Sequence, residues 1–254
     1  MKTQPKALFL LNFVSMWECF SYYGMRVLLV LYMVGELGYS DEKAFGMYAL
    51  YITLVELGGV IGGIAADRYL GLKRAIVLGG ITIALGHVCM TLPDSQMLFL
   101  LGLGLIVAGT GLFRSNVTAL LGEFYDKNDP QRAAGYTLFY TGINIGGFLA
   151  SVACGIVGEV YGWHAGFGLA ALGMLSGLVV LYFGRAILGT KGELERPAKS
   201  ATKMGSLGLG FAAPLAAVMI YYYREVAPLV PVAIGGLLYY VYRQIKEASP
   251  EAKA

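Results

Sequence analysis

The sequence carries little charge for its length. Only 14% of its 254 residues are Asp, Glu, Lys or Arg, whereas an ordinary soluble domain is roughly a quarter charged. The hydrophobic fraction is 57% and the mean hydropathy is +0.65. This composition excludes an ordinary soluble domain and indicates an integral membrane protein, because membrane helices must present apolar side chains to lipid.

Several chemical features are also missing. The three cysteines, Cys19, Cys89 and Cys154, all fall in apolar stretches, so we expect buried free thiols and neither a disulfide framework nor a zinc site. No Lys/Arg run is interleaved with aromatic residues, so we expect no nucleic-acid partner. The sequence shows no nucleophile–base pair, metal-ligand spacing or phosphate loop. We therefore expect no enzymatic activity, no metal and no cofactor.

Long apolar runs occupy most of the chain. A helix needs about 20 apolar residues to cross the hydrocarbon core of a membrane. The first run has no small-residue cleavage site after it, so we expect a retained span and not a removed signal peptide. The sequence predicts eight spans, of which the last two are the shortest: 7–34, 45–66, 74–92, 96–121, 133–158, 164–187, 205–222 and 227–243.

The basic residues predict an orientation for these spans. Lys43 and Arg224 fall on one side of the membrane, and Arg26 and Arg114 fall within spans, while the other basic residues all fall on the opposite side. Lys and Arg are enriched in cytoplasmic loops. We therefore expect a multi-pass protein of the inner (cytoplasmic) membrane with both termini in the cytoplasm.

One polar segment, KGELERPAKSATK (191–203), interrupts the apolar pattern. It predicts three parts: a six-helix transmembrane bundle at 1–190, a cytoplasmic linker at 191–204, and a transmembrane helix pair with a polar tail at 205–254. Small residues four positions apart let membrane helices approach closely. Four such pairs predict helix contacts: Gly58/Gly62, Gly59/Gly63, Gly142/Gly146 and Gly173/Gly177.

Four ionisable residues lie inside predicted spans: Glu18, Arg26, Glu56 and Arg114. Such groups cost several kcal/mol in a bilayer core, so they usually pair and face a bundle interior or a water-filled cavity. Glu18, Tyr22 and Arg26 are spaced i, i+4, i+8 and form one stripe on a helix. A purely structural network is one interpretation. The pattern favours a polar cavity that binds something anionic, zwitterionic or protonatable.

Four motifs then resemble those of one family. The stretches, in chain order, are WECFSYYGMR (17–26), GGIAADRYLGLKR (62–74), GTGLFRSNVTALLGEFY (109–125) and FYTGINIGG (139–147). Together they resemble the signatures of the proton-dependent oligopeptide transporter family, within the major facilitator superfamily. The resemblance implies an all-α membrane fold in which 1–190 is the N-terminal six-helix half. The pair at 205–243 is similar to the extra hairpin of bacterial members, and the C-terminal half is absent from the sequence.

The resemblance also implies roles for individual residues. Proton coupling needs groups that change charge, so Glu18, which the family pattern keeps, and Glu56, at a position that is often tyrosine in the family, are the proton-coupling candidates. An arginine would face the carboxylate of a short peptide, and an acid its amine. The implied substrate-binding residues are Tyr22, Tyr23, Arg26, Arg114 and Asn144. The implied conformational loop is formed by Asp67, Arg68 and Gly71.

Several motif positions depart from the family pattern, among them Ser115 where the fourth-helix motif has a proline, and three others change the ionisable groups of the site. Ser15 stands where the family has an acid, Cys19 where it has an arginine, and Arg114 where it has a lysine. Ser15 cannot hold a proton that titrates near neutral pH, and Cys19 cannot make bidentate contacts. Arg114 keeps its charge, whereas a buried lysine can be neutralised. We expect Glu56 to pair with Arg26 or Arg114 and to replace part of the missing charge balance.

Three functional hypotheses follow. In the first, the chain is one half of a proton-coupled di/tripeptide symporter, which needs the lipid bilayer and a second bundle, either a homodimer or a separate half. In the second, it is a degenerate accessory or scaffold subunit of a larger membrane complex and does not transport. In the third, it is a truncated reading of a full transporter, although the polar tail QIKEASPEAKA is typical of a finished C-terminus.

Overall fold

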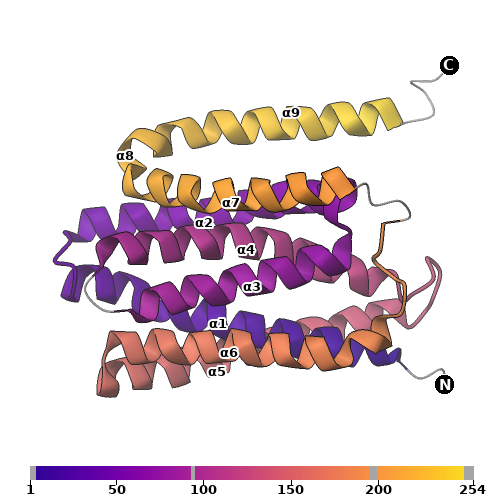
Figure 1. The fold of residues 1–254 in the computed structure, drawn as a ribbon, viewed down its shortest axis with the longest axis horizontal. Coiled ribbons are helices and arrows are strands. Elements are labelled where there is room, and N and C mark those ends of the chain that lie inside the picture. Colours follow the sequence, from indigo (N-terminus) through magenta and orange to yellow (C-terminus); the bar gives the residue numbers. More distant parts are fainter. Residues whose placement is uncertain (1–3, 93–94, 195–198, 249–254) are drawn as a thin grey trace.

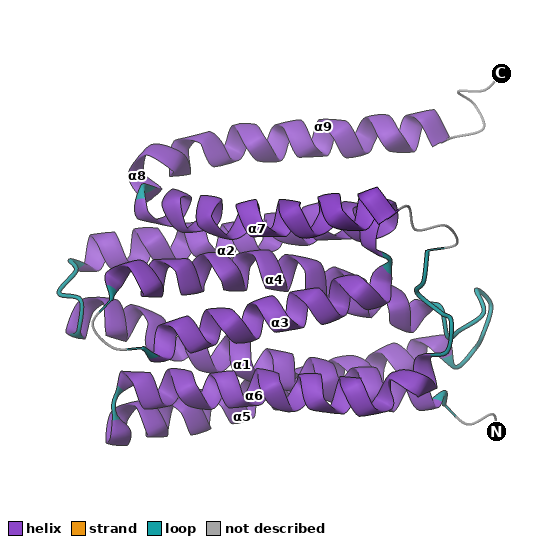
Figure 2. Cartoon of the chain, viewed as in Figure 1, coloured by secondary structure: helices purple, strands orange, loops and turns teal. Residues whose placement is uncertain are grey.

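The computed structural model describes residues 4–92, 95–194 and 199–248. These residues form helices, turns and loops, without a strand, which confirms the predicted all-α fold. The short loops gather at the two ends of the bundle (Figure 2). The elements are α1 (Lys6–Gly35), α2 (Asp41–Ala65), η1 (Ala66–Leu70), α3 (Leu72–Thr91), α4 (Gln96–Gly122), α5 (Arg132–Tyr161), α6 (Trp163–Gly184), η2 (Arg185–Leu188), α7 (Lys199–Tyr221), α8 (Tyr223–Val226), η3 (Ala227–Leu229) and α9 (Val230–Ala248).

Local chemistry sets several helix boundaries. The Ser40 hydroxyl accepts a hydrogen bond from the backbone N–H of Lys43 at 3.3 Å, which caps the first turn of α2. Ser95 caps α4 in the same way, through the N–H of Leu98 at 3.2 Å. Gly71 and Gly162 separate consecutive helices with φ of 78° and 90°, a conformation that glycine adopts without a Cβ clash.

The first six helices pack as two groups of three. α1 packs closely against α5 and α6, and α4 packs closely against α2 and α3. α3 and α6 join the two groups, whereas α1 and α4 touch only sparsely. We call this sparse α1–α4 contact the seam. Figure 1 shows the helices side by side, with the start of α1, the start of α3 and the end of α6 at the same end of the bundle.

Glycine permits the closest helix contacts. A Cβ added to Gly62 of α2 would overlap the carbonyl oxygen of Gly111 in α4. On α5, Gly142 lies against the Asn12 side chain of α1, and Gly146 against the Met16 carbonyl. The pair Gly173/Gly177 of α6 likewise packs on α1. Three of the four predicted glycine pairs therefore lie at helix contacts.

The pair Gly59/Gly63 does not lie at a close contact. Gly59 has no neighbour within 4 Å of an added Cβ, and Gly63 has only the Ser115 hydroxyl at 3.9 Å. The reason is helical phase. Gly58 and Gly62 already point at α4, so residues one position further along turn about 100° away from it.

By length and composition, five helical segments of the described chain can cross a membrane, namely those from α2 with η1 to α6 with η2. α1 has the required length of 30 residues but is not among the five. It carries Asn12, Glu18, Tyr22, Tyr23 and Arg26, whose polar groups lower its hydropathy. The helix expected at 7–34 is present, and its polarity marks it as the helix that carries the site.

The final helices adjoin the six-helix bundle. α7 packs against α4 and begins at Lys199, inside the segment expected to be a linker, while 195–198 lie outside the described residues. The segments Gly208–Tyr221 and Tyr223–Tyr240 meet at a bend of 94° and pass as a membrane element only together. α9 lies on the far side of α7 from the bundle (Figure 1), with Leu238, Tyr239 and Tyr242 exposed.

The α2–α4 contact generates a testable prediction. Gly62→Ala forces a methyl group against the backbone of α4, and we expect it to lower stability by about 1–3 kcal/mol, as overpacking usually does. Gly59→Ala is the matched control, since it fills open space on the same helix and alanine favours helix. Thermal unfolding of the purified variants in detergent measures both. Equal midpoints for the two variants would contradict the packing assigned to Gly62.

Candidate functional site

An ion pair is buried at the seam. Glu18 of α1 is 1% exposed, and both of its carboxylate oxygens accept hydrogen bonds from Arg114 Nε of α4, at 3.1 and 3.2 Å. The two helices make few other contacts. This pair is therefore a principal connection across the seam between the two three-helix groups.

The Arg114 guanidinium is held in place and retains a donor. Its Cζ lies 3.9 Å from the centroid of the Tyr22 ring, a cation–π arrangement. Its Nη2 is buried and has no hydrogen-bond partner among the described residues, although the side chain as a whole is 30% exposed. A guanidinium has five N–H donors. Arg114 can therefore bind a further acceptor, such as a carboxylate, beside Glu18.

A second guanidinium lies against the same ring. Arg26 Cζ is 5.2 Å from the Tyr22 centroid and 5.4 Å from the Tyr23 centroid. Its Nε and Nη2 both donate to the Tyr48 hydroxyl of α2, at 3.1 and 2.7 Å. In the described part of the chain, no carboxylate forms an ion pair with Arg26. The site therefore holds two arginines and one buried acid around Tyr22.

The expected pairing of Glu56 is not formed. Glu56 is exposed on α2 and makes no ion pair with Arg26 or Arg114 among the described residues. Arg114 pairs with Glu18 instead. Arg26 bonds the Tyr48 hydroxyl, and Tyr48 lies eight residues, or about 12 Å along the helix axis, from Glu56. Glu56 remains within electrostatic range of Tyr22. It is near the site without being paired in it.

The two replaced motif residues of α1, Ser15 and Cys19, lie within one helical turn of Glu18. The Cys19 thiol donates to Glu18 Oε2 at 3.5 Å. Ser15 is buried, and its hydroxyl has no partner in the described residues. One turn further along, the Ser21 hydroxyl lies 3.2 Å from His87 Nε2 of α3. The first-helix motif thus keeps polar contacts along the buried side of α1.

Sequence reasoning missed two tyrosines of α2. Tyr48 holds Arg26 as described, and Tyr51 stacks on Tyr22 with ring centroids 6.4 Å apart and planes at 27°. The Tyr51 hydroxyl is buried without a hydrogen-bond partner in the described structure. Their i, i+3 spacing places both rings on one face of α2, which is the signal that the sequence offered.

The other substrate-binding candidates lie at the margin of this cluster. Tyr23 is 38% exposed and packs edge-on against Tyr22. Its ring also lies close to Gly147 of α5. Asn144 lies on an exposed part of α5, and its side chain forms no hydrogen bond with the described residues. The structure does not bring Asn144 into the ion-pair cluster.

The predicted conformational loop lies at the end of the bundle near the start of α1. Asp67 and Arg68 belong to η1, and the Gly71 N–H closes that turn on the Ala66 carbonyl at 2.8 Å. Arg68 Nη2 donates to the Tyr240 hydroxyl of α9 at 3.2 Å. The loop thus connects α2 to α3 and contacts the last helix.

The segment after η2 packs on this loop. Lys73 donates to the Gly189 carbonyl and to Glu193 Oε1, the latter at 2.6 Å. The Lys73 ammonium lowers the pKa of the Glu193 carboxyl below its ordinary value, so the carboxylate stays ionised at neutral pH. Glu123 Oε2 accepts from the Gly192 N–H at 2.7 Å. These contacts tie the ends of α3, α4 and α6 together.

The buried charges between the two three-helix groups indicate the class of protein to which this chain belongs. Within the described ranges, no three His, Cys, Asp or Glu side chains converge on a point that could hold a metal ion. What the chain does present is a membrane helix bundle with buried charges between two three-helix groups. Secondary transporters of the major facilitator type are built from such three-helix repeats, with polar sites near the bilayer midplane.

Comparisons with known proteins agree with this class. The family model PTR2, described as the POT family, matches residues 73–205. The uncharacterized transporter YclF of Bacillus subtilis is 40% identical over 223 residues, which is 85% of this chain and 45% of the relative. A di-/tripeptide transporter of Lactococcus lactis subsp. cremoris is 40% identical over 189 residues, which is 72% of this chain and 38% of the relative.

A solved structure gives the same result. The crystal structure of peptide transporter POT in complex with sulfate superposes with a TM-score of 0.79 at 38% identity, and covers 97% of this chain and 53% of its own. The chain therefore belongs to the POT family, as its motifs indicated. It spans less than half the length of these curated relatives, and its fold matches about half of that structure.

The ion pair generates a second prediction. Glu18→Gln leaves Arg114 without a counter-charge, and breaking a buried pair costs about 3–5 kcal/mol. We expect a loss near the lower limit, because Arg114 is partly exposed. Glu56→Gln, which removes an exposed and unpaired acid, should change stability by less than about 0.5 kcal/mol. Denaturant unfolding in mixed micelles measures both variants.

The double variant provides the decisive comparison. In Glu18→Gln/Arg114→Gln the seam is neutral, so part of the stability lost in Glu18→Gln should return. Simple addition of the two single losses would show that the two side chains do not interact across the seam.

Proposed function

We propose that this chain forms one wall of the substrate path in a proton-coupled peptide symporter. The observation that supports this is the buried Glu18–Arg114 pair, whose guanidinium retains a buried donor. The Lactococcus relative is named a di-/tripeptide transporter, and we extend that substrate class to this chain. In the proposal, residues 1–190 carry the path, the polar segment from 191 to the start of α7 is the linker, and the helices from α7 onward form an appended pair in the inner membrane, with both termini cytoplasmic.

The pair suggests how a proton could be coupled to a peptide. Arg114 stays charged at working pH, so the titrating partner must be the acid. When Glu18 accepts a proton, its neutral carboxyl attracts the guanidinium far less. Arg114 then offers its donors to the carboxylate of a peptide, and a planar guanidinium can bind a carboxylate with two parallel hydrogen bonds.

The neighbouring groups complete the proposed site. Arg26, the second cation beside Tyr22, adds positive charge for the same carboxylate. Glu56 is the second proton-coupling candidate and can face the peptide amine. Tyr23 and Asn144, at the exposed margin, provide side contacts. The short peptide is thereby bound through its two charged ends, independently of its side chains.

A second bundle must supply the opposite wall. In major-facilitator transporters, two six-helix halves rock around a site between them, and this chain contributes one six-helix set. The second set can be another copy, a separate chain or further sequence of the same protein. Native mass measurement after gentle purification from the host membrane identifies which of these is present.

Transport assays test the coupling. In membrane vesicles with an imposed proton gradient, we expect uptake of a labelled dipeptide that a protonophore abolishes. Glu18→Gln should lower this uptake at least tenfold while leaving peptide exchange at zero gradient, because Gln cannot release a proton. Protonophore-sensitive uptake that is unchanged in Glu18→Gln would refute the role of Glu18. The Glu56→Gln variant tests the second acid in the same assay.

A further inference from the structure

A large groove lies along α3 and α6, the two helices that join the three-helix groups. It runs between α3 and the α6–η2 segment and has a volume of about 1080 Å³. Its walls carry exposed apolar side chains, including Val77 and Ile81 of α3 and Leu175 and Val179 of α6. Among the described residues, it involves none of the residues that bind or stack around Arg26 and Arg114. The groove is therefore separate from the proposed peptide path.

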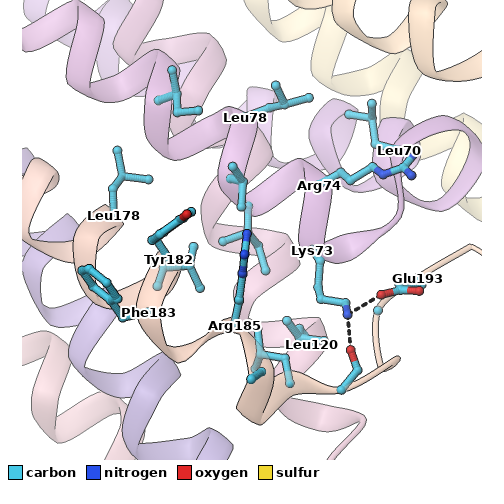
Figure 3. Close-up of a pocket in the computed structure, with 18 of the residues that line it drawn as sticks. Leu70, Lys73, Arg74, Leu78, Leu120, Leu178, Tyr182, Phe183, Arg185 and Glu193 are labelled. Atoms are coloured by element: carbon cyan, nitrogen blue, oxygen red, sulfur yellow. Dashed lines mark hydrogen bonds and ion pairs between the residues drawn. The ribbon is translucent and has the colours of Figure 1, made fainter.

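Positive charge gathers at one end of this groove. Lys73, Arg74 and Arg185 line it, against a single acid, Glu193. Lys73 bonds Glu193, and Arg185 Cζ stacks 4.6 Å from the centroid of the Tyr182 ring. No described carboxylate forms an ion pair with Arg185. Figure 3 shows Arg185 between Tyr182 and Lys73, on the side of the groove nearest the loop of Glu193.

The dimensions of the groove match one membrane leaflet. From Arg185 back to Leu175, the α6–η2 wall is about 15 Å long at about 1.5 Å per residue. The hydrocarbon core is about 30 Å thick, so the groove is as deep as half of it. The basic groups lie at the first turn of α3 and the end of α6, where those helices end. The groove is therefore charged where its helices end and apolar toward the middle of the bundle.

We propose that this groove binds one anionic phospholipid. The headgroup phosphate lies at the basic end of the groove beside Arg185, where Arg74 adds positive charge, and an acyl chain lies along Val77, Ile81 and Val179. Basic pockets between membrane helices suit anionic headgroups in this way. A free anion would bind the basic end of the groove, formed by Lys73, Arg74 and Arg185, but would not account for the exposed apolar walls. An apolar partner helix would bury the walls but supply no negative charge for Arg185, which pairs with no described carboxylate.

Native mass spectrometry of the chain, purified from its own membrane with any partner retained, tests the proposal. The probes are dioleoyl phosphatidylglycerol and dioleoyl phosphatidylcholine. We expect preferential retention of the anionic lipid. Each Lys or Arg near a membrane surface contributes roughly fivefold to anionic-lipid attraction. Arg74→Gln/Arg185→Gln should therefore reduce the preference by about 25-fold, while Arg185→Lys should retain most of it.

A matched control separates a site from diffuse surface charge. Lys127→Gln/Arg132→Gln removes two cations from the same end of the bundle, outside the groove. Arg132 is also stacked on a tyrosine, Tyr136. We expect this variant to keep the lipid preference of the unaltered chain. An equal loss in both double variants would overturn the proposal in favour of a general electrostatic attraction.

Two further arms test the apolar half. Val179→Trp narrows the apolar part of the groove without changing its charge, and we expect it to reduce retention of the anionic lipid at least severalfold. Inorganic phosphate, added as a competitor, should displace the lipid poorly, because it makes no contact with the apolar walls of the groove. Full displacement by phosphate would show that the basic residues bind an anion without any contribution from the apolar walls, and would overturn the proposal. A protein bound in the groove would also overturn it, because that protein would be the occupant in place of the lipid.

Discussion

The Glu18–Arg114 ion pair is the interaction on which the arrangement of the site depends. It joins α1 to α4 where these helices otherwise touch sparsely. Removing two charges from water can exceed their mutual attraction, so a buried pair is weak evidence of added stability. An apolar contact would hold the two helices at lower cost. The presence of the pair at this seam therefore favours a functional role, in which the pair opens and reforms.

The glycine contacts complement this polar seam. Where Gly62 lies against Gly111, and where Gly142 and Gly146 lie against α1, the backbones approach so closely that any side chain would interfere. Such contacts pack the helices of each three-helix group closely, and close-packed interiors have low compressibility, so each group resists deformation as a unit. Charges placed between rigid units can then respond to a proton or a ligand without disturbing the packing inside either unit.

The sequence predicted elements and faces better than partners. The stripe of Glu18, Tyr22 and Arg26 followed from helical spacing alone, and the structure places all three in one cluster. Which residue meets which across helices depends on axial position and rotation, which local pattern does not encode. Arg26 therefore turned out to bond Tyr48, and Arg114 bonds Glu18, where pairing with Glu56 was expected. The pair Gly59/Gly63 was misplaced for the same reason.

Arginine has different surroundings at the seam and at the groove. Arg114 has a counter-ion, an aromatic ring against its face and a buried donor. Its low-dielectric surroundings strengthen a charged hydrogen bond, which suits selective binding of one carboxylate. Arg185 stacks on an exposed tyrosine at the end of α6. There its charge is screened within about 8–10 Å, which suits a surface ligand that is bound both by this charge and by the apolar walls of the groove. Arg74 and Arg185 lie far apart in the sequence, so only the fold reveals that they share a groove.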